Sequence, residues 1–413
     1  MGDVVNMNVE QIMGDIENRR DQMVEDLVQM SLIPSVNPKS NGTGEYERMM
    51  WLTKILDDYS VPYKIYEAED VSVKEKKRLN IVVKIEGTDK SEKTLWFISH
   101  LDTVPAGDLD QWNSDPFIPL VKDGKVYGRG VEDNGQAVIC TLHTCLIMFE
   151  NNIKAKCNVG FIFASDEETG SDYGLKILVN EGVFHVGDEA IVPDAGSKDG
   201  SFVEIAEKSM AWVKFTVTGK QAHASMPHLG INASSVSCYF AVELEEALRD
   251  KYFYSDKLFD PSYSTFEITQ KYANVDSPNI LPGKDEFVID MRILPIYKVN
   301  EVVCDINELI AKYESKYKVK INYQFLNRVD APEPTSVNSP IVINLVKSIT
   351  EKGITPKIGG IGGGTCASII REIGLPAVVW STLDELAHQP NEYVVIDNLI
   401  TDTQVFVSTV LKY

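Results

Sequence analysis

The sequence lacks three features that would each point to a particular class of protein. No run of about 18 or more apolar residues occurs, so no membrane-spanning helix is predicted. None of the six cysteines forms a C-x-x-C pair, which argues against a zinc–thiolate site and favours buried, reduced thiols. The opening residues, MGDVVN, have neither a basic start nor an apolar core, unlike a secretory signal. We therefore expect a cytoplasmic protein.

Basic residues are also few relative to acidic ones. The chain has 40 Lys and Arg against 61 Asp and Glu, which gives a formal net charge of −21. Such a charge repels nucleic acid and anionic lipid, because both are bound mainly through Lys and Arg, so neither partner is expected. It also repels small anions, so a substrate with a carboxylate requires a cation within its site.

The chain is long enough for two domains. It has 413 residues, 44% of them hydrophobic, which is more than one ordinary core organises. Apolar residues at helical spacing mark 8–31 and 46–58, and apolar strand-like runs alternate with helical segments up to residue 193. The expected strands are 63–66, 80–85, 94–99, 157–165 and 190–193, with a buried helix over 135–150. This order predicts an α/β fold with a mixed, mainly parallel sheet sandwiched by helices.

A second pattern begins near Lys208. Strands are expected at 212–218, 264–269, 286–294 and 319–325, and helices at 231–249 and 297–314. The order strand, helix, strand, strand, helix, strand is that of a ferredoxin-like α+β unit. The Pro-rich DAPEP at 330–334 then predicts a linker. We therefore expect a catalytic domain in two parts, 1–207 and 329–413, with an inserted domain over 208–328.

Acidic and histidine residues gather in five short segments, mostly at strand ends or in Gly-rich turns. The segments are FISHLDTVP (97–105), GRGVEDNGQ (128–136), FASDEETGS (163–171), VPDAG (192–196) and ELAHQPNEY (385–393). Sites in α/β proteins form at the carboxyl ends of strands. Together the segments offer two His and several carboxylates, which is the ligand inventory of a two-metal hydrolytic site.

The first two segments suggest particular roles. In a strand, residues i and i+2 share a face, so His100 can bind a cation through one ring nitrogen while Asp102 accepts a hydrogen bond from the other. A surface His–Asp pair is the alternative. Asp133, in a strand-to-helix turn, either bridges two cations or caps the helix. The Asp133–Asn134 peptide is a candidate for a cis bond.

The remaining segments add a general base and further ligands. Glu167 and Glu168 are adjacent and point apart, so one can bind metal while the other, Glu167, passes a proton from water to the leaving amine. A solvated acidic loop is the alternative. Asp194 follows an apolar strand, and His388 lies in a loop before the final helix, where a lone His is usually structural.

These segments, in this order, resemble the two-zinc metallohydrolases that include succinyl-diaminopimelate desuccinylase, acetylornithine deacetylase, aminoacylase, carboxypeptidase G and the cytosolic di- and tripeptidases. The resemblance runs from about residue 20 to the C-terminus and implies a zinc exopeptidase-like fold. It implies Glu167 as general base, Asp102 as the partner that orients His100, and two divalent metal ions per subunit, held by His100, Asp133 and Asp194 and by Asp133, Glu168 and His388. Zinc is favoured, although cobalt and manganese suit the same ligands.

The inserted domain carries its own part of the resemblance. GKQAHASMPHLGINA (219–233) resembles the segment in which the family places an oxyanion-stabilising His, here His223. In dimeric members that His reaches the neighbouring subunit, so a homodimer through this lid and dimerisation domain is implied. NILPGKDEFVIDMR (279–292) resembles the lid segment that holds substrate through Asn279 and Arg292. The guanidinium of Arg292 would supply the cation that the acidic charge requires.

A Gly-rich loop completes the expected substrate site. GGGT (362–365) resembles the family loop whose backbone N–H groups approach a substrate carboxylate, here at Gly363, Gly364 and Thr365. Two positions bear on the substrate. Family deacylases usually carry Glu where this chain has Asp194, which favours a peptidase, whereas Cys366 stands where many relatives carry Asp and weakens that preference.

The residues and the resemblance together predict a metal-dependent hydrolase. It would cleave the amide bond of a small N-acyl amino acid or short peptide with a free carboxylate, as desuccinylase- and deacetylase-like deacylases do. Two alternatives remain open. One is a cytosolic di- or tripeptidase or a carboxypeptidase, and the other is a catalytically silent relative that binds metal or peptide.

Overall fold

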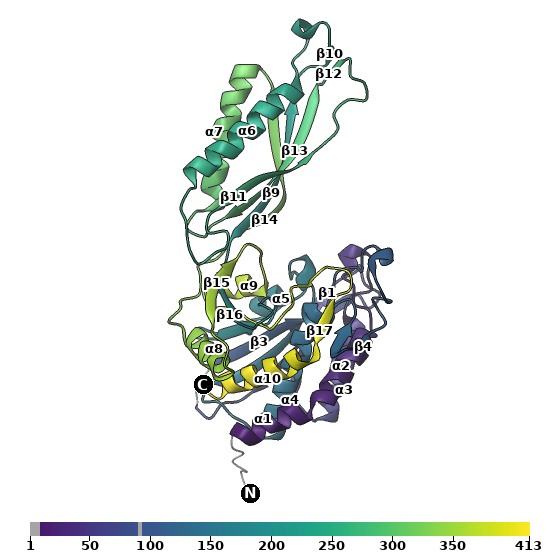
Figure 1. Cartoon of the computed structure of the whole chain (residues 1–413), viewed down its shortest axis with the longest axis vertical. Coiled ribbons are helices and arrows are strands. Elements are labelled where there is room, and N and C mark those ends of the chain that lie inside the picture. Colours follow the sequence, from purple (N-terminus) through teal and green to yellow (C-terminus); the bar gives the residue numbers. More distant parts are fainter. Residues whose placement is uncertain (1–8, 90–92) are drawn as a thin grey trace. The chain divides into compact units, whose positions relative to one another are not determined.

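The computed structural model describes residues 9–89 and 93–413, which divide into two compact units (Figure 1). Unit 1 contains the residues up to Ile205 together with Thr335–Ile358 and Thr365–Tyr413. Unit 2 contains Ala206–Pro334 and the short segment Gly359–Gly364. The sequence placed this Gly-rich segment in the C-terminal catalytic part of the chain, whereas its contacts group it with unit 2.

Unit 1 is built on an eight-stranded sheet in the order β1–β2–β6–β3–β7–β16–β8–β15. The strands are β1 (Tyr63–Glu69), β2 (Lys77–Ile85), β6 (Asn158–Ala164), β3 (Thr94–His100), β7 (Glu189–Val192), β16 (Ala377–Val379), β8 (Phe202–Glu207) and β15 (Lys357–Ile361). The four central strands β6, β3, β7 and β16 pair in parallel, whereas β1, β2 and β8 pair antiparallel. The predicted mixed α/β fold is therefore confirmed, with a parallel centre.

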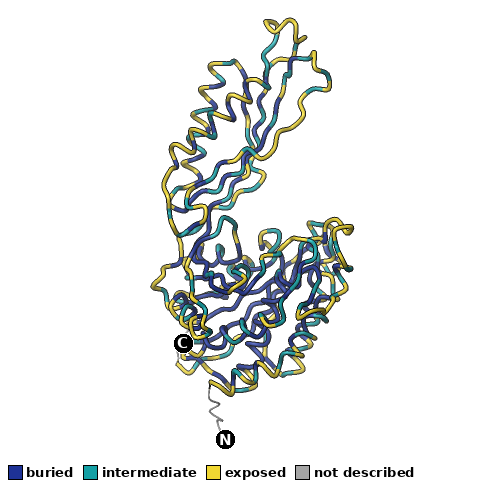
Figure 2. The backbone as a smooth tube through the Cα atoms, viewed as in Figure 1, coloured by how far each residue is buried: buried dark blue, intermediate teal, exposed yellow. Residues whose placement is uncertain are grey.

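Helices accompany this sheet, and its central strands are buried. The helices are α1 (Val9–Asn18), α2 (Arg20–Ser31), α3 (Tyr46–Asp58), α4 (Ala137–Glu150), α5 (Leu175–Asn180), α8 (Pro340–Glu351), α9 (Cys366–Glu372) and α10 (Ile396–Val410). Every residue of β3, β6 and β7 is buried, which explains their unbroken apolar sequences (Figure 2). Short strands β4 (Leu120–Lys122), β5 (Lys125–Tyr127) and β17 (Tyr393–Val395) form a separate sheet.

One predicted helix is two helices. The apolar spacing over 8–31 indicated a single element, but the chain turns at Arg19, between α1 and α2. The backbone N–H of Arg19 bonds the carbonyl of Ile16, three residues back, and this tighter turn interrupts the α-helical ladder. Hydrophobic periodicity did not reveal the break, because Ile12, Ile16 and Met23 are all buried on either side of it.

Unit 2 has the predicted ferredoxin-like order of elements. They are β9 (Ser209–Thr218), α6 (Ala233–Lys251), β11 (Thr265–Lys271), β13 (Lys284–Ile293), α7 (Val299–Tyr317) and β14 (Lys320–Val329). The sheet runs β11–β13–β9–β14, with antiparallel pairing throughout (Figure 1). Buried residues alternate along β9, and the core contains apolar residues of α6 and α7. A two-stranded pair, β10 (Ala222–His223) with β12 (Ile280–Leu281), lies apart from this sheet.

In the part of the chain that the structure describes, no helix combines the length and the apolar character needed to cross a membrane.

A glycine in β6 makes room for the largest side chain of the neighbouring strand. Gly160 pairs with Trp96 of β3, and a Cβ at this position would stand 2.1 Å from the indole ring. We expect Gly160→Ala to lower the free energy of unfolding by about 1–3 kcal/mol, because the packed core must shift. Chemical denaturation measures the change.

Gly14 provides the matched control. It lies in α1, where an added Cβ meets no atom within 4 Å. Gly14→Ala should therefore raise the free energy of unfolding by about 0.5–1 kcal/mol, since alanine favours the helix. Equal effects of the two substitutions would contradict the packing explanation.

Candidate metal centre

Five residues expected to bind metal meet at one edge of the unit 1 sheet. His100 ends β3, Asp194 follows β7, and Glu168 lies in the turn Glu167–Thr169 after β6. These three strands are parallel neighbours, so their carboxyl ends share an edge. Asp133 lies in the segment Val131–Gln136 before α4, where its own backbone is not helical, and His388 lies in the loop before β17.

The five side chains form two groups that share Asp133. The Nε2 atom of His100 lies 3.2 Å from Oδ1 of Asp133 and 3.3 Å from Oδ1 of Asp194. The Nε2 atom of His388 lies 3.2 Å from Oδ2 of Asp133 and 3.1 Å from Oε2 of Glu168. Within each group the donor atoms lie within 4.8 Å of one another. Asp133 thus presents one oxygen to each group.

This donor set fits divalent cations. Two donor atoms that each lie about 2.1 Å from a tetrahedral ion are about 3.4 Å apart, close to the four separations found here. Imidazole nitrogen and carboxylate oxygen are ligands that zinc, cobalt and manganese all accept. The arrangement therefore matches two neighbouring cation sites bridged by one carboxylate.

The electrostatics of the cluster also require positive charge. Burial would lower the pKa of His100, but the aspartates around the ring raise it well above its ordinary value. Hydrogen bonds to Asp133 and Glu168 raise the pKa of His388 to about 10. Although burial opposes it, hydrogen bonds from both imidazoles lower the pKa of Asp133. Without metal, the imidazoles hold protons that balance the carboxylates, and a bound cation would replace those protons.

Glu167 lies beside the two groups but belongs to neither. Its Oε2 is 3.9 Å from Nε2 of His100. Burial, followed by the charge of Asp194, raises the pKa of Glu167 well above its ordinary value. Glu168, in contrast, uses one oxygen toward His388 and the other to accept the backbone N–H of Val104 at 3.1 Å. The two adjacent carboxylates therefore have different surroundings.

Asp102 acts differently from the sequence-based interpretation. The Nδ1 atom of His100 lies 3.1 Å from the backbone oxygen of Asp102, whereas the carboxylate Oδ1 is 3.6 Å away. The carboxylate instead accepts the backbone N–H groups of Glu167 at 3.0 Å and Glu168 at 3.2 Å. It also accepts the side-chain amide of Asn37 at 2.9 Å. Asp102 thus holds the His100 ring through its backbone and the glutamate turn through its side chain.

Sequence reasoning missed several supporting residues. The amide of Asn134 donates to Asp194 Oδ1 at 2.7 Å, and its oxygen accepts the backbone N–H of His100 at 3.2 Å. The peptide between Asp133 and Asn134 is cis, as the sequence suggested. Glu132 and Glu392 are buried next to the site. Their only sequence signal is proximity to a ligand or its segment, because acidic residues in loops usually face water.

Two of the predicted substrate-site residues lie close together in unit 2. The register pairs His223 with Ile280, and the backbone oxygen of Asn279 accepts the N–H of Ala224 at 2.9 Å. Nδ1 of His223 accepts the backbone N–H of Ser225 at 3.1 Å, so the neutral ring carries its proton on Nε2. The side-chain oxygen of Asn279 accepts the Ser277 hydroxyl at 2.7 Å, so its NH₂ group remains a donor.

Arg292 is held by its own strand and by the Gly-rich loop. Its Nε and Nη2 donate to the two carboxylate oxygens of Asp290 at 2.8 and 3.0 Å, and Nη1 donates to the carbonyl of Gly362 at 2.7 Å. Among the described residues, these bonds use three of the five guanidinium N–H groups. Two N–H groups remain for a carboxylate.

The Gly-rich loop shows no internal crowding. A Cβ at Gly363 would meet no atom within 4 Å, and the nearest atom to one at Gly364 is Oε2 of Glu207 at 3.8 Å. The hydroxyl of Thr365 accepts the N–H of Ala367 at 3.1 Å and caps α9. A role of these residues in substrate binding stays a prediction.

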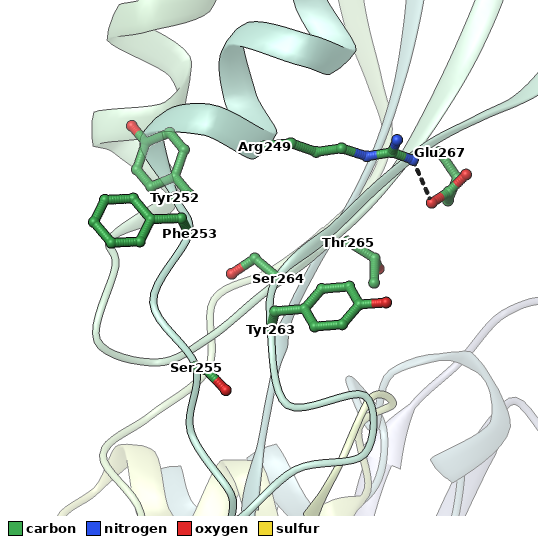
Figure 3. Close-up of a pocket in the computed structure, with 8 residues that line it drawn as sticks. All are labelled: Arg249, Tyr252, Phe253, Ser255, Tyr263, Ser264, Thr265 and Glu267. Carbon is green, nitrogen blue, oxygen red and sulfur yellow. Dashed lines mark hydrogen bonds and ion pairs between the residues drawn. The ribbon is translucent and has the colours of Figure 1, made fainter.

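A separate pocket of about 490 Å³ lies in unit 2, where α6 ends and β11 begins (Figure 3). Arg249 and Glu267 line it and pair with each other at 2.8 Å, and Arg249 also pairs with Glu245. None of the predicted catalytic or metal-binding side chains lines this pocket.

The fold and the donor set define a metal-dependent amidohydrolase. Residues 96–412 match the family model described as peptidase family M20/M25/M40, and the chain belongs to this family. It is 43% identical over 393 residues to an uncharacterized metallohydrolase of Methanocaldococcus jannaschii, covering 91% of this chain and 95% of the relative. It is also 26% identical over 374 residues to a succinyl-diaminopimelate desuccinylase of Rickettsia bellii, covering 88% and 90%.

Solved structures share the fold. A tripeptidase from Staphylococcus aureus superposes with a TM-score of 0.76 at 19% identity, covering 95% of this chain and 98% of that one. Human carnosine dipeptidase 1 superposes with a TM-score of 0.69 at 17% identity, covering 98% of each. Together with the His and carboxylate cluster, membership of the family establishes divalent metal binding as a property of this chain.

Metal binding should release protons. Both site histidines have raised pKa values, that of His388 about 10, so both are protonated in the metal-free chain at neutral pH. A cation requires the neutral rings, so its affinity should rise with pH between 6 and 8, by about tenfold per pH unit for each proton displaced. Calorimetric titration of the metal-stripped protein in buffers of different ionisation enthalpy counts these protons.

The variant His388→Ala provides the control for this measurement, because it should release one proton fewer. Binding heats that do not depend on the buffer, together with an affinity that does not depend on pH, would contradict the assignment of these charges.

Proposed function

We propose that this chain hydrolyses the amide bond of a small N-acyl amino acid or short peptide that carries a free carboxylate. One cation would be held by His100, Asp133 and Asp194, and the other by Asp133, Glu168 and His388, with zinc favoured over cobalt and manganese. The observation that carries the proposal is the sharing of Asp133 between two ligand groups beside a partly buried carboxyl group, Glu167.

Glu167 is proposed as the group that moves the proton. When bound, divalent cations in such a site polarise the scissile carbonyl and lower the pKa of water. Glu167 takes a proton from the attacking water on a carboxylate oxygen and delivers it to the nitrogen of the leaving amine. Its raised pKa, caused first by burial, suits a group that must hold a proton near neutral pH. The backbone N–H groups of Glu167 and Glu168 donate to the carboxylate of Asp102, and these bonds keep the glutamate turn in place.

Unit 2 is proposed to bind the substrate. His223 would stabilise the oxyanion through Nε2–H, a role that the bond at its Nδ1 supports. The NH₂ group of Asn279 and the two remaining N–H groups of Arg292 would bind substrate oxygens, Arg292 gripping the carboxylate. The backbone N–H groups of Gly363 and Gly364 and the polar groups of Thr365 would complete that site.

The dimensions of unit 2 support a homodimer. His223 lies next to the end of β13 at which the strand begins, at Lys284, and Arg292 is eight positions further along. At about 3.3 Å per residue these positions are about 26 Å apart, whereas an extended dipeptide spans about 7 Å. Two residues that act on one small substrate across such a distance must come from different copies. The proposed dimer would form through unit 2, with His223 and the adjacent Asn279 serving the neighbouring site.

Two further proposals concern which acyl group is removed and where in the cell the protein is located. Similarity to desuccinylases supports a deacylase that removes a succinyl or acetyl group. The alternative is a di- or tripeptidase or a carboxypeptidase, which Asp194 favours by family resemblance. A silent relative that only binds metal or peptide would be expected to have lost a ligand or the base, and here all these positions are filled. A cytoplasmic location stays a prediction.

A substrate panel tests the proposal directly. The protein, loaded with zinc, cobalt or manganese in turn, is offered N-succinyl and N-acetyl amino acids and di- and tripeptides, each with a free or an amidated C-terminus. We expect hydrolysis of free acids and a marked loss with the amides, because Arg292 would grip the carboxylate. Release of amine measures turnover. A fully metal-loaded protein that cleaves nothing would support the silent relative.

Replacement of Glu167 shows whether this residue acts as the general base or as a metal ligand. Glu167→Ala should lower kcat by about 10²–10⁴-fold, the usual contribution of a general acid–base group, while metal analysis still finds close to two ions per chain. Glu168→Ala, a neighbour of the same chemistry, should lose one ion instead. If Glu167→Ala also loses metal, Glu167 is a ligand and the proposed mechanism is wrong.

A further inference from the structure

The loop that carries His388 needs a positioning device. The His388 side chain is 57% exposed, and its backbone has a left-handed φ of 65°. Glu385 and Asn391, in the same loop, also have positive φ values of 59° and 61°. Little apolar packing holds the loop, because residues 384–391 are exposed or half-buried. Yet the imidazole lies within 3.2 Å of two carboxylates that belong to other segments.

Glu132 supplies the missing constraint. Its side chain is buried, and each carboxylate oxygen accepts one backbone N–H of the His388 loop. Oε1 accepts the N–H of Asp384 at 2.7 Å, and Oε2 accepts the N–H of Leu386 at 2.5 Å. Bonds from two alternate amides to one rigid carboxylate fix both the position and the direction of the loop.

Glu392, at the far end of the loop, makes the same kind of contact in the opposite direction: its carboxylate accepts backbone N–H groups of the segment that carries Asp133. Glu392 is fully buried, and its Oε1 accepts the N–H groups of Glu132 at 2.8 Å and Asp133 at 3.0 Å. Its Oε2 accepts the N–H of Gly130 at 3.0 Å and Nη1 of Arg129 at 2.7 Å. The segment that carries Asp133 and the loop that carries His388 are therefore bound to each other on both sides of His388.

We propose that Glu132 is a positioning residue for the second cation. Its carboxylate fixes residues 384–388 so that His388 meets Asp133 and Glu168, and it thereby sets the affinity on that side of the site. The inference rests on the proposed function, since it assumes two cations. The alternative is that Glu132 raises the affinity for the second cation by its negative charge alone, because any buried carboxylate near a cation attracts it.

Three substitutions distinguish position from charge. Glu132→Gln removes the charge and one of the two acceptors, and Glu132→Asp keeps the charge but shortens the side chain. Glu385→Gln, the control, removes a charge from the same loop at an exposed side chain. If Glu132 acts by positioning the loop, both Glu132 variants bind the second cation more weakly and the control does not. If Glu132 acts by its charge, Glu132→Asp binds the second cation as tightly as the wild type does.

Zinc titration of the metal-stripped full chain against a chromophoric chelator measures the zinc affinity of each of the two sites. His388→Ala identifies which of the two binding steps belongs to the His388 side. We expect Glu132→Gln and Glu132→Asp to weaken that step by about 10–100-fold, as is typical for groups that orient a ligand, and to leave the other step unchanged. Both variants binding two ions within twofold of the wild type would overturn the inference. A wild type that binds fewer than two ions would instead refute the proposed function.

Hydrogen exchange tests, in the metal-free protein, whether Glu132 holds the His388 loop. In the metal-stripped wild type, the amides of Asp384 and Leu386 should exchange slowly although the loop is exposed, because both donate to Glu132. In Glu132→Gln at least one should exchange much faster, while the amides of α4 keep their protection. Rapid exchange of both amides in the wild type would overturn the inference, even if the variants failed to fold.

Discussion

The carboxylate of Asp133 lies between two imidazoles, with Oδ1 3.2 Å from His100 and Oδ2 3.2 Å from His388. Both oxygens have separate partners, so the carboxylate cannot rotate without losing one. Glu167, Glu168 and Asp194 gather round it, at least partly buried. Carboxylates this close repel one another unless protons or cations intervene. The edge of the sheet is therefore built around positive charge, and the rest of the site follows from that requirement.

A second set of carboxylates binds backbone rather than cations. Asp102 holds the glutamate turn, Glu132 holds the start of the His388 loop, and Glu392 holds the segment before α4. Each is buried, and each satisfies N–H groups that a turn would otherwise leave unpaired. Ligands on loops acquire defined positions in this way, which matters because small displacements weaken both metal binding and catalysis.

The sequence predicted the parts of this arrangement that depend on strands. Unbroken apolar runs identified β3, β6 and β7, and the residues that follow parallel strands necessarily meet at one edge. His388 follows no such strand; its segment was singled out for its His and acidic residues, and its place in a ligand set came only from the family resemblance. Glu132 and Glu392 escaped notice because acidic loop residues usually face solvent, and burial is a property of the folded chain. The turn at Arg19 rests on a local backbone hydrogen bond that hydrophobic periodicity does not reveal. The grouping of 359–364 with unit 2 depends on tertiary contacts, which periodicity does not contain.

Anomalous X-ray scattering from crystals of the zinc-loaded protein shows whether Asp133 bridges two cations. We expect two peaks about 3.5–4 Å apart, one bonded to Oδ1 and the other to Oδ2 of Asp133, with His100 and His388 on opposite sides. A single peak, or two peaks that do not share Asp133, would contradict the bridging role of Asp133.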